Sequence, residues 1–194
     1  MWATTTSRRP RRPRASTRRA RSRSPTTGRR RSSARVAGAA DVAGVPQVGE
    51  PAPDFTLQDV HGTPVTLSDL RGAPVLVVFF PFAFSGICTG EMCEIRDNLE
   101  DFETAGVRVL AISCDPVYSL RAWSEQEGYD FDLLSDFWPH GDVARAYGVL
   151  DENRGLAIRG SFLVDEDGVI RWSIVNAPGE KRAFSGYHQA LTLV

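Results

Sequence analysis

The chain has 194 residues, 42% hydrophobic and 24% charged, which is typical of one globular domain with a full apolar core. Its most apolar run, residues 74–87, is too short to span a membrane. Three cysteines without a Cys-x-x-Cys pair argue against a secreted disulfide scaffold, against a thioredoxin-type redox pair and against a zinc site.

Residues 1–45 form an Arg-rich segment that we predict to be disordered. Thirteen of the 23 basic residues lie within residues 1–40, where there is no acid, so the formal charge is +13 there and −14 in the remainder. So few apolar side chains cannot offset the entropy of ordering such a segment. Three interpretations stay open: an arm that binds nucleic acid, an organellar targeting peptide, or translated sequence upstream of the true start.

The folded domain is predicted to span residues 46–194 and to begin with a β-hairpin. Val75 to Phe80 is wholly apolar and rich in β-branched and aromatic residues, as expected of a central strand buried on both faces. In chain order, the elements expected in this part are extended chain at 48–55, strands at 55–57 and 65–67, a helical turn capped by Ser68-Asp69, and the strand at 75–80.

A helix is predicted after Cys88 because apolar residues recur on one face, and Gly106 ends it. At about 100° per residue, that face carries Cys88, Met92, Ile95, Leu99 and Phe102. The elements expected next are a strand at 107–113, a helix at 117–128, a strand at 131–134, a helical turn at 143–147, strands at 159–164 and 169–175 around the turn 165–168, and a helix at 182–193. This order predicts an α/β fold whose mixed central sheet is covered by helices on both faces.

Cys88 is the strongest candidate for chemistry, because the apolar strand delivers it to the start of that helix. Backbone N–H groups without intrahelical partners and the positive end of the helix macrodipole lie at such a position. Both stabilise a thiolate, which makes a cysteine nucleophilic at neutral pH. The alternative is that Cys88 only fills apolar space.

The segment from Pro81 to Cys88 follows the pattern Pro-x-x-x-Ser-x-x-Cys, which resembles the active-site signature of the peroxiredoxins, a family of thiol peroxidases that reduce hydroperoxides. Residues 79–88 and 133–141 are most similar to the alkyl hydroperoxide reductase E group. The resemblance extends from about Val48 to the C-terminus. It implies a thioredoxin-like fold with an N-terminal β-hairpin, and peroxidase activity.

The resemblance implies a role for each residue of the site. Cys88 is the peroxidatic nucleophile. Ser85, where many members have threonine, orients the peroxide through a hydroxyl that both donates and accepts. Pro81 lacks an N–H and has a fixed φ, so it shapes the loop and covers the sulfur. Arg159 places a permanent cation beside the thiolate, and Glu91 holds that arginine through a charge-assisted pair.

Two of these assignments have simpler alternatives. Ser85 also suits a helix cap, and Arg159 also suits a surface ion pair with Asp151 or Glu152. The function itself has one alternative: a non-turnover sensor or binding protein whose cysteine is oxidised once.

Cys93 is the candidate resolving thiol, because the Cys-x-x-x-x-Cys spacing is similar to that of the Q-type, or bacterioferritin comigratory, peroxiredoxins. Helix geometry separates the two Cα atoms by about 8.6 Å, whereas a disulfide needs less than about 7 Å. A Cys88–Cys93 link therefore requires the first turns of the helix to unwind. The alternatives are that Cys93 is passive, that Cys114, a weaker candidate, resolves the oxidised thiol, and that an external thiol does so.

The implied partners are a hydroperoxide substrate, a reductant that is thioredoxin, another redoxin or a low-molecular-weight thiol, and a second copy of the chain in a homodimer. Nucleic acid is an expected partner only if the Arg-rich segment belongs to the native protein. No cofactor, metal or membrane is expected. The compartment expected is the cytoplasm, unless the Arg-rich segment directs the chain to an organelle.

Overall fold

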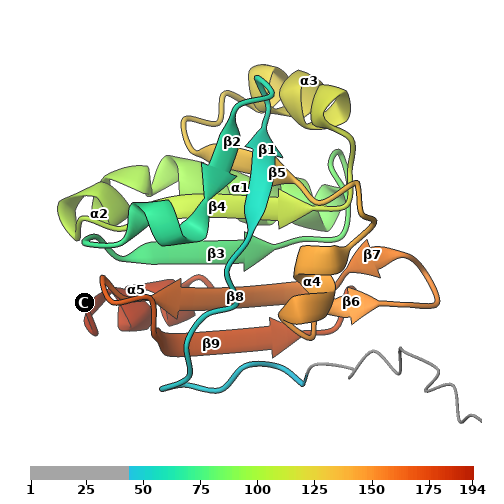
Figure 1. Ribbon diagram of the computed structural model, residues 1–194. Helices are drawn as coiled ribbons and strands as arrows, with labels where there is room; N and C mark the ends of the chain where they lie inside the picture. The colour runs from blue at the N-terminus through green and yellow to red at the C-terminus, as the bar shows by residue number, and fades with distance from the viewer. Residues whose placement is uncertain (1–43) are drawn as a thin grey trace, which may run out of the picture. The chain divides into compact units, whose positions relative to one another are not determined.

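The computed structural model describes residues 44–194, so the Arg-rich segment predicted at 1–45 lies almost entirely outside the described residues. The described part is built on a seven-stranded sheet in the order β2-β1-β5-β4-β3-β8-β9 (Figure 1). Its strands are β1 (Thr56–Asp59), β2 (Pro64–Thr66), β3 (Val75–Phe79), β4 (Arg108–Ser113), β5 (Asp132–Ser135), β8 (Arg159–Val164) and β9 (Ile170–Asn176).

The sheet is mixed, as predicted. The central strands β3, β4 and β5 are parallel to one another. Strands β1 and β2 form the expected N-terminal hairpin, and β1 joins the sheet antiparallel to β5. On the other side, β8 pairs antiparallel with β3, and β9 with β8. Because β8 runs against β3, its first residues lie beside the carboxyl end of β3.

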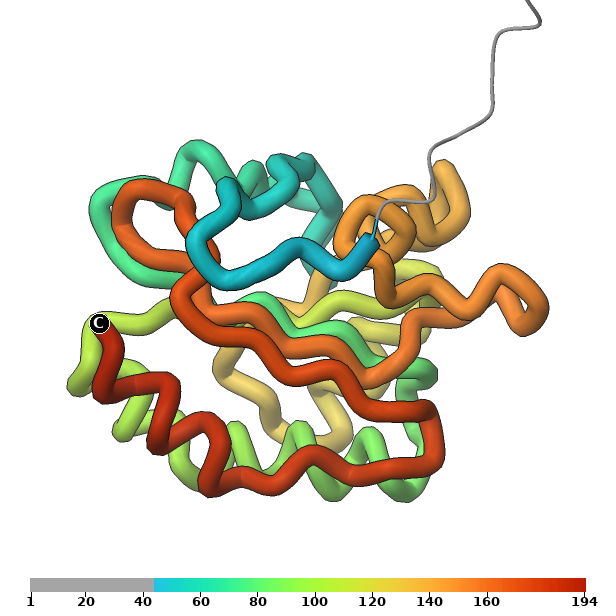
Figure 2. Tube along the Cα trace, turned by 90° about the horizontal axis from the view of Figure 1, so that it is seen from below, coloured from blue at the N-terminus to red at the C-terminus, as the bar shows by residue number. Residues whose placement is uncertain are grey.

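Helices cover both faces of the sheet, which confirms the predicted thioredoxin-like α/β class. Four of them pack on one face: α1 (Gly86–Asp97), α2 (Leu99–Thr104), α3 (Val117–Glu127) and α5 (Ser185–Leu191). The other face is covered by the 3₁₀ helix η1 (Leu67–Leu70) and by α4 (Asp142–Ala146). Figure 2 shows α5, in dark red, lying beside the green helices α1 and α2.

The apolar pattern of the sequence explains the core. All five residues of β3 are buried, and alternate side chains enter the clusters on the two faces: Leu76 and Val78 on the face of α1, Val77 and Phe79 on the face of α4. The apolar stripe predicted after Cys88 is buried against the first of these faces, with only Leu99 partly buried.

The single helix predicted after Cys88 is in fact two helices. They meet at Asn98, which has a non-helical backbone (φ −121°, ψ 25°) and whose side-chain Nδ2 donates to the carbonyl of Glu94 at 2.8 Å. Asparagine offers the backbone such local alternatives to a helical hydrogen bond. The break therefore falls on a polar residue within the stripe, which periodicity alone does not reveal.

Three further details differ from the prediction. The last helix begins at Ser185, so Arg182 precedes it in a loop. The helical turn η1 has Thr66 as its N-cap and no side-chain capping bond. A small hairpin of β6 (Leu150–Asp151) and β7 (Leu156–Ala157) was not predicted, because two-residue strands leave no periodicity to detect. Among the described residues, no helix has the length and apolar composition needed to cross a membrane.

Candidate active site

Cys88 lies in the first turn of α1, directly after the loop that follows β3. Its side chain is completely buried, in the cluster that α1 forms with the sheet. Ser85 is the N-cap residue: its backbone is extended and its carbonyl accepts the Thr89 N–H at 2.8 Å. The Ser85 hydroxyl makes no capping hydrogen bond, so it is available to another partner.

The loop before α1 is anchored from the neighbouring strand end. Asp115, just after β4, accepts the Ala83 N–H at 2.9 Å and the Ser113 hydroxyl at 2.8 Å. Pro81 is buried in this loop. Phe84 has a φ of 61°, in the left-handed region that is unfavourable for a bulky residue. The backbone therefore adopts a conformation of raised energy immediately before the helix that carries Cys88.

Two buried arginines meet one buried carboxylate beside this helix start. Glu91, Arg159 and Arg182 are each only 2–3% exposed. Arg159 donates to Glu91 through Nη1 and to the Pro178 carbonyl through Nε at 2.9 Å. Arg182 donates to both oxygens of Glu91, through Nη2 at 2.8 Å and Nε at 3.2 Å, and its backbone N–H adds a third bond at 2.7 Å.

The pairing of strands explains why Arg159 arrives here. Val78 of β3 faces Ser161 of β8 in the antiparallel register, so Arg159, two residues earlier in β8, lies where β3 ends. The structure thus brings Arg159 to Glu91 and not to Asp151 or Glu152. Glu152 pairs instead with Arg145, at 2.7 Å.

Arg182 is the residue of this cluster that the sequence did not indicate. The sequence pattern predicts it to lie in the final helix, whereas it lies in the loop between β9 and α5 and is almost fully buried. Its Nη1 also donates to the carbonyls of Phe79 and Gly160 and to the hydroxyl of Ser161. No local motif marks it, because its partners come from β3, β8 and α1.

The cluster has one carboxylate and two guanidinium groups, so its formal charge is +1. Burial by itself lowers the pKa of Arg182, but interactions with its neighbours Tyr187, Glu91 and Cys88 raise it, and the net shift is upward. Cys88 is therefore close enough to Arg182 for electrostatic interaction. Within residues 44–194, the hydrogen bonds of the Arg159 side chain are made through Nε and Nη1, and Nη2 makes none.

Cys93 lies five residues further along α1 and is half-buried, so it belongs to the edge of the core rather than to the solvent-facing side. Its Sγ is 3.8 Å from Glu127 Oε2 and 3.9 Å from Tyr129 Oη. Helix α1 is continuous from Gly86 to Asp97, and the three cysteines of the chain are free thiols. The helix thus separates Cys93 from Cys88.

Cys114 lies at the end of β4, with different neighbours. Burial, with a smaller contribution from the charge of Asp136, raises the pKa of its thiol to about 12. The thiol is therefore protonated at neutral pH. The backbone of Ala157, which belongs to the cluster on the α4 face, is also in contact with it.

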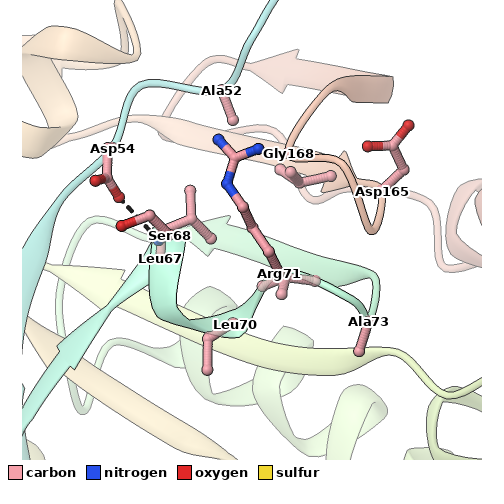
Figure 3. Close-up of a pocket in the computed structure, with 11 residues that line it drawn as sticks. Ala52, Asp54, Leu67, Ser68, Leu70, Arg71, Ala73, Asp165 and Gly168 are labelled. Carbon is pink, nitrogen blue, oxygen red and sulfur yellow. Dashed lines mark hydrogen bonds between the residues drawn. The ribbon is translucent and has the colours of Figure 1, made fainter.

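The remaining polar features do not extend this site. His140 is 2.8 Å from the Gly155 carbonyl through Nε2, which ties its loop to the β6–β7 hairpin. Residues 44–194 contain no group of three or more His, Cys, Asp or Glu side chains that could hold a metal. Leu67, Arg71 and Gly168 line a separate cavity (Figure 3), which involves none of the residues around Cys88 and has a volume of about 20 Å³.

The mixed sheet with its N-terminal hairpin and its helices on both faces defines the class of thioredoxin-like α/β proteins, and here a buried thiol lies at the start of α1. The AhpC/TSA family model matches residues 48–173. The chain belongs to this family of peroxiredoxins, and it is a thiol peroxidase that reduces hydroperoxides.

Relatives and solved structures agree with this family. Alkyl hydroperoxide reductase E of Mycobacterium tuberculosis is 52% identical over 136 residues, which cover 70% of this chain and 89% of that protein. A peroxiredoxin of Thermoplasma volcanium is 38% identical, covering 66% of this chain and 64% of the relative. The crystal structure of peroxidoxin BcpB from M. tuberculosis is 32% identical, with a TM-score of 0.65, covering 75% of this chain and 94% of that one.

Proposed function

We propose that Cys88 is the peroxidatic residue and that Glu91, Arg159 and Arg182 supply the positive charge it needs. The observation that carries this proposal is the complete burial of Cys88 in the first turn of α1, beside a buried cluster with a formal charge of +1. The helix start and the cluster both favour an anion at the same place.

In the proposed reaction, the Cys88 thiolate attacks the terminal oxygen of the peroxide R–O–O–H. The S–O bond forms as the O–O bond breaks, and Cys88 becomes a sulfenic acid. The other oxygen leaves as an alkoxide and takes a proton from solvent, giving an alcohol, or water where the substrate is hydrogen peroxide. The sulfur is oxidised and the peroxide is reduced by the same electron pair.

Each neighbouring residue has a proposed part in this step. Ser85 orients the peroxide through its uncapped hydroxyl, and Pro81 excludes water from the sulfur. The free Nη2 of Arg159 donates to the peroxide oxygens and stabilises the charge that develops on the leaving oxygen. Glu91 positions Arg159, and Arg182 completes the charge without being required to touch substrate.

Recycling of the sulfenic acid is proposed to follow one of two routes. An external thiol attacks the Cys88 sulfur, releasing water and forming a mixed disulfide, which a second thiol then reduces. Alternatively, Cys93 makes this attack after the first turns of α1 unwind. Gly86 and Gly90 in these turns, and the missing side-chain cap, favour the second route because glycine and an uncapped end both weaken a helix.

We also propose a homodimer whose contact surface adjoins the site. Three apolar side chains around Cys88 are 41–50% exposed, namely Phe82, Phe84 and Ile87, and Trp138 is 80% exposed in the loop after β5. Such a group of exposed apolar residues is typical of a protein interface.

We further propose that the protein works in a reducing compartment such as the cytoplasm, which the free thiols in residues 44–194 support.

Peroxide consumption with a thiol reductant tests the proposed nucleophile. We expect many turnovers per chain and none in Cys88→Ser, whereas a single stoichiometric event would indicate a sensor. Mass spectrometry after one equivalent of peroxide distinguishes the recycling routes. A Cys88–Cys93 link supports the internal route, a persistent sulfenic acid supports the external one, and a Cys88–Cys114 link would contradict both.

A further inference from the structure

We propose that Tyr187, on the C-terminal helix α5, is a positioning residue of the peroxidase site and acts on Arg182 through the hydroxyl of Ser161. The inference rests on the proposed function, in which Arg182 contributes charge beside Cys88. Tyr187 would extend the site to α5, an element separate from helix α1, which carries Cys88, and from the strands beside it.

The three residues form one buried chain of hydrogen bonds. The Ser161 hydroxyl lies 2.9 Å from the Tyr187 hydroxyl and accepts from Arg182 Nη1 at 3.0 Å. All three side chains are at most 4% exposed. From Arg182 the chain continues through Glu91 to Arg159, so Tyr187 is connected to every charged member of the site.

The orientation of Arg182 depends on these bonds. Its Nη1 carries two hydrogens but faces three acceptors: the Phe79 carbonyl at 2.9 Å, the Gly160 carbonyl at 3.1 Å and the Ser161 hydroxyl at 3.0 Å. A serine hydroxyl rotates unless its partners hold it, and arginine has no acceptor to offer. Tyr187 is the partner that keeps the Ser161 oxygen turned toward Nη1.

The hydroxyl of Tyr187 and its aromatic ring make different contacts. The ring contacts three aromatic neighbours, Phe184, Trp172 and Phe102, with centroids 5.5, 5.9 and 6.2 Å away. These contacts are unchanged when only the hydroxyl is removed. Tyr187→Phe therefore leaves α5 packed against the sheet and removes only its hydrogen bond to Ser161.

The experiment measures the second-order rate constant for oxidation of Cys88 by hydrogen peroxide, by rapid mixing over a series of pH values. In Tyr187→Phe we expect a rate about fivefold lower and a pH–rate profile moved to higher pH, because one buried hydrogen bond no longer holds Arg182. Tyr147→Phe is the matched control. Tyr147 is equally buried and donates to the Pro53 carbonyl at 2.9 Å, on the face of α4.

A double-mutant cycle tests whether Tyr187 acts through Ser161. We expect Ser161→Ala to slow oxidation at least as much as Tyr187→Phe, and the double variant to be no slower than Ser161→Ala alone. Additive effects, a native rate in either single variant, or an equal loss in Tyr147→Phe would overturn the proposal. Failure of the proposed function would be distinct, because peroxide turnover would then survive in Cys88→Ser.

Discussion

Replacement of Arg182 by methionine tests directly whether the site works by positive charge. The arginine side chain makes five hydrogen bonds, two to Glu91 and three through Nη1. Methionine retains much of the aliphatic volume but carries no charge. Glu91 and Arg159 then remain as a neutral pair, and the formal charge of the cluster falls from +1 to zero.

The structure sets the size of both expected effects. Removing one partner from a buried ionic network costs about 3–5 kcal/mol, and we expect about 3 kcal/mol because Glu91 keeps Arg159. For a domain of this size, that lowers the Tm by about 6–12 °C. Loss of an interaction with a charged group, worth about 1.5–3 kcal/mol, slows Cys88 oxidation by about 10- to 150-fold if it is made in the transition state.

Rapid-mixing kinetics and urea unfolding measure these two quantities separately. Arg182→Lys keeps the charge but not the two-pronged contact with Glu91, so we expect an intermediate rate. Arg108→Met is the control, because Arg108 is 46% exposed in an ion pair with Asp132, and we expect less than about 1 kcal/mol and no change in rate. A folded Arg182→Met protein that reacts within twofold of the native rate would refute the electrostatic argument.

Three other predictions concern residues near the site. Burial raises the pKa of Asp136 to about 6 from 3.8, so the folded state binds this proton more tightly than the unfolded chain. As the pH falls from about 7 to 4, the free energy of unfolding of the native protein should therefore rise by up to about 3 kcal/mol relative to that of Asp136→Asn. A stability difference between the two proteins that stays constant with pH, measured by urea unfolding, would contradict this. Asp115→Ala releases the Ala83 N–H, so it should cost about 1–3 kcal/mol and slow peroxide oxidation; a native oxidation rate would count against the loop anchor. Cys114→Ala should leave multiple turnover unchanged, and lost turnover would make Cys114 the resolving thiol.

The sequence predicts most of the fold because local pattern and tertiary structure agree in its central elements. The apolar run at 75–80 and the stripe after Cys88 are buried as expected, and the turn at 165–168 joins two antiparallel strands. The break at Asn98 escaped prediction because neighbouring apolar residues continue the helical period on both sides. Composition does not reveal where a polar side chain will take over a backbone hydrogen bond.

The candidate site was predictable to the extent that it is contiguous in sequence. Pro81, Ser85, Cys88 and Glu91 lie within eleven residues, where spacing carries information. Arg159 was found only through resemblance to a family. Arg182 has no such mark, since its burial depends on how the loop after β9 crosses the ends of β3 and β8.

Glu91 links the chemistry of Cys88 to its recycling. It lies between Cys88 and Cys93 on α1 and accepts four hydrogen bonds from the two arginines. Unwinding α1 far enough to join the two sulfurs would therefore disturb all four of these bonds. On the proposed mechanism, the negative charge of the attacking sulfur balances the +1 cluster before the reaction with peroxide. Oxidation to a neutral sulfenic acid removes that anion and leaves a buried charge without compensation. On the proposed internal route, the peroxide reaction thus removes an anion that stabilises the start of α1, and we expect unwinding toward Cys93 to follow the reduction of the peroxide and not to precede it.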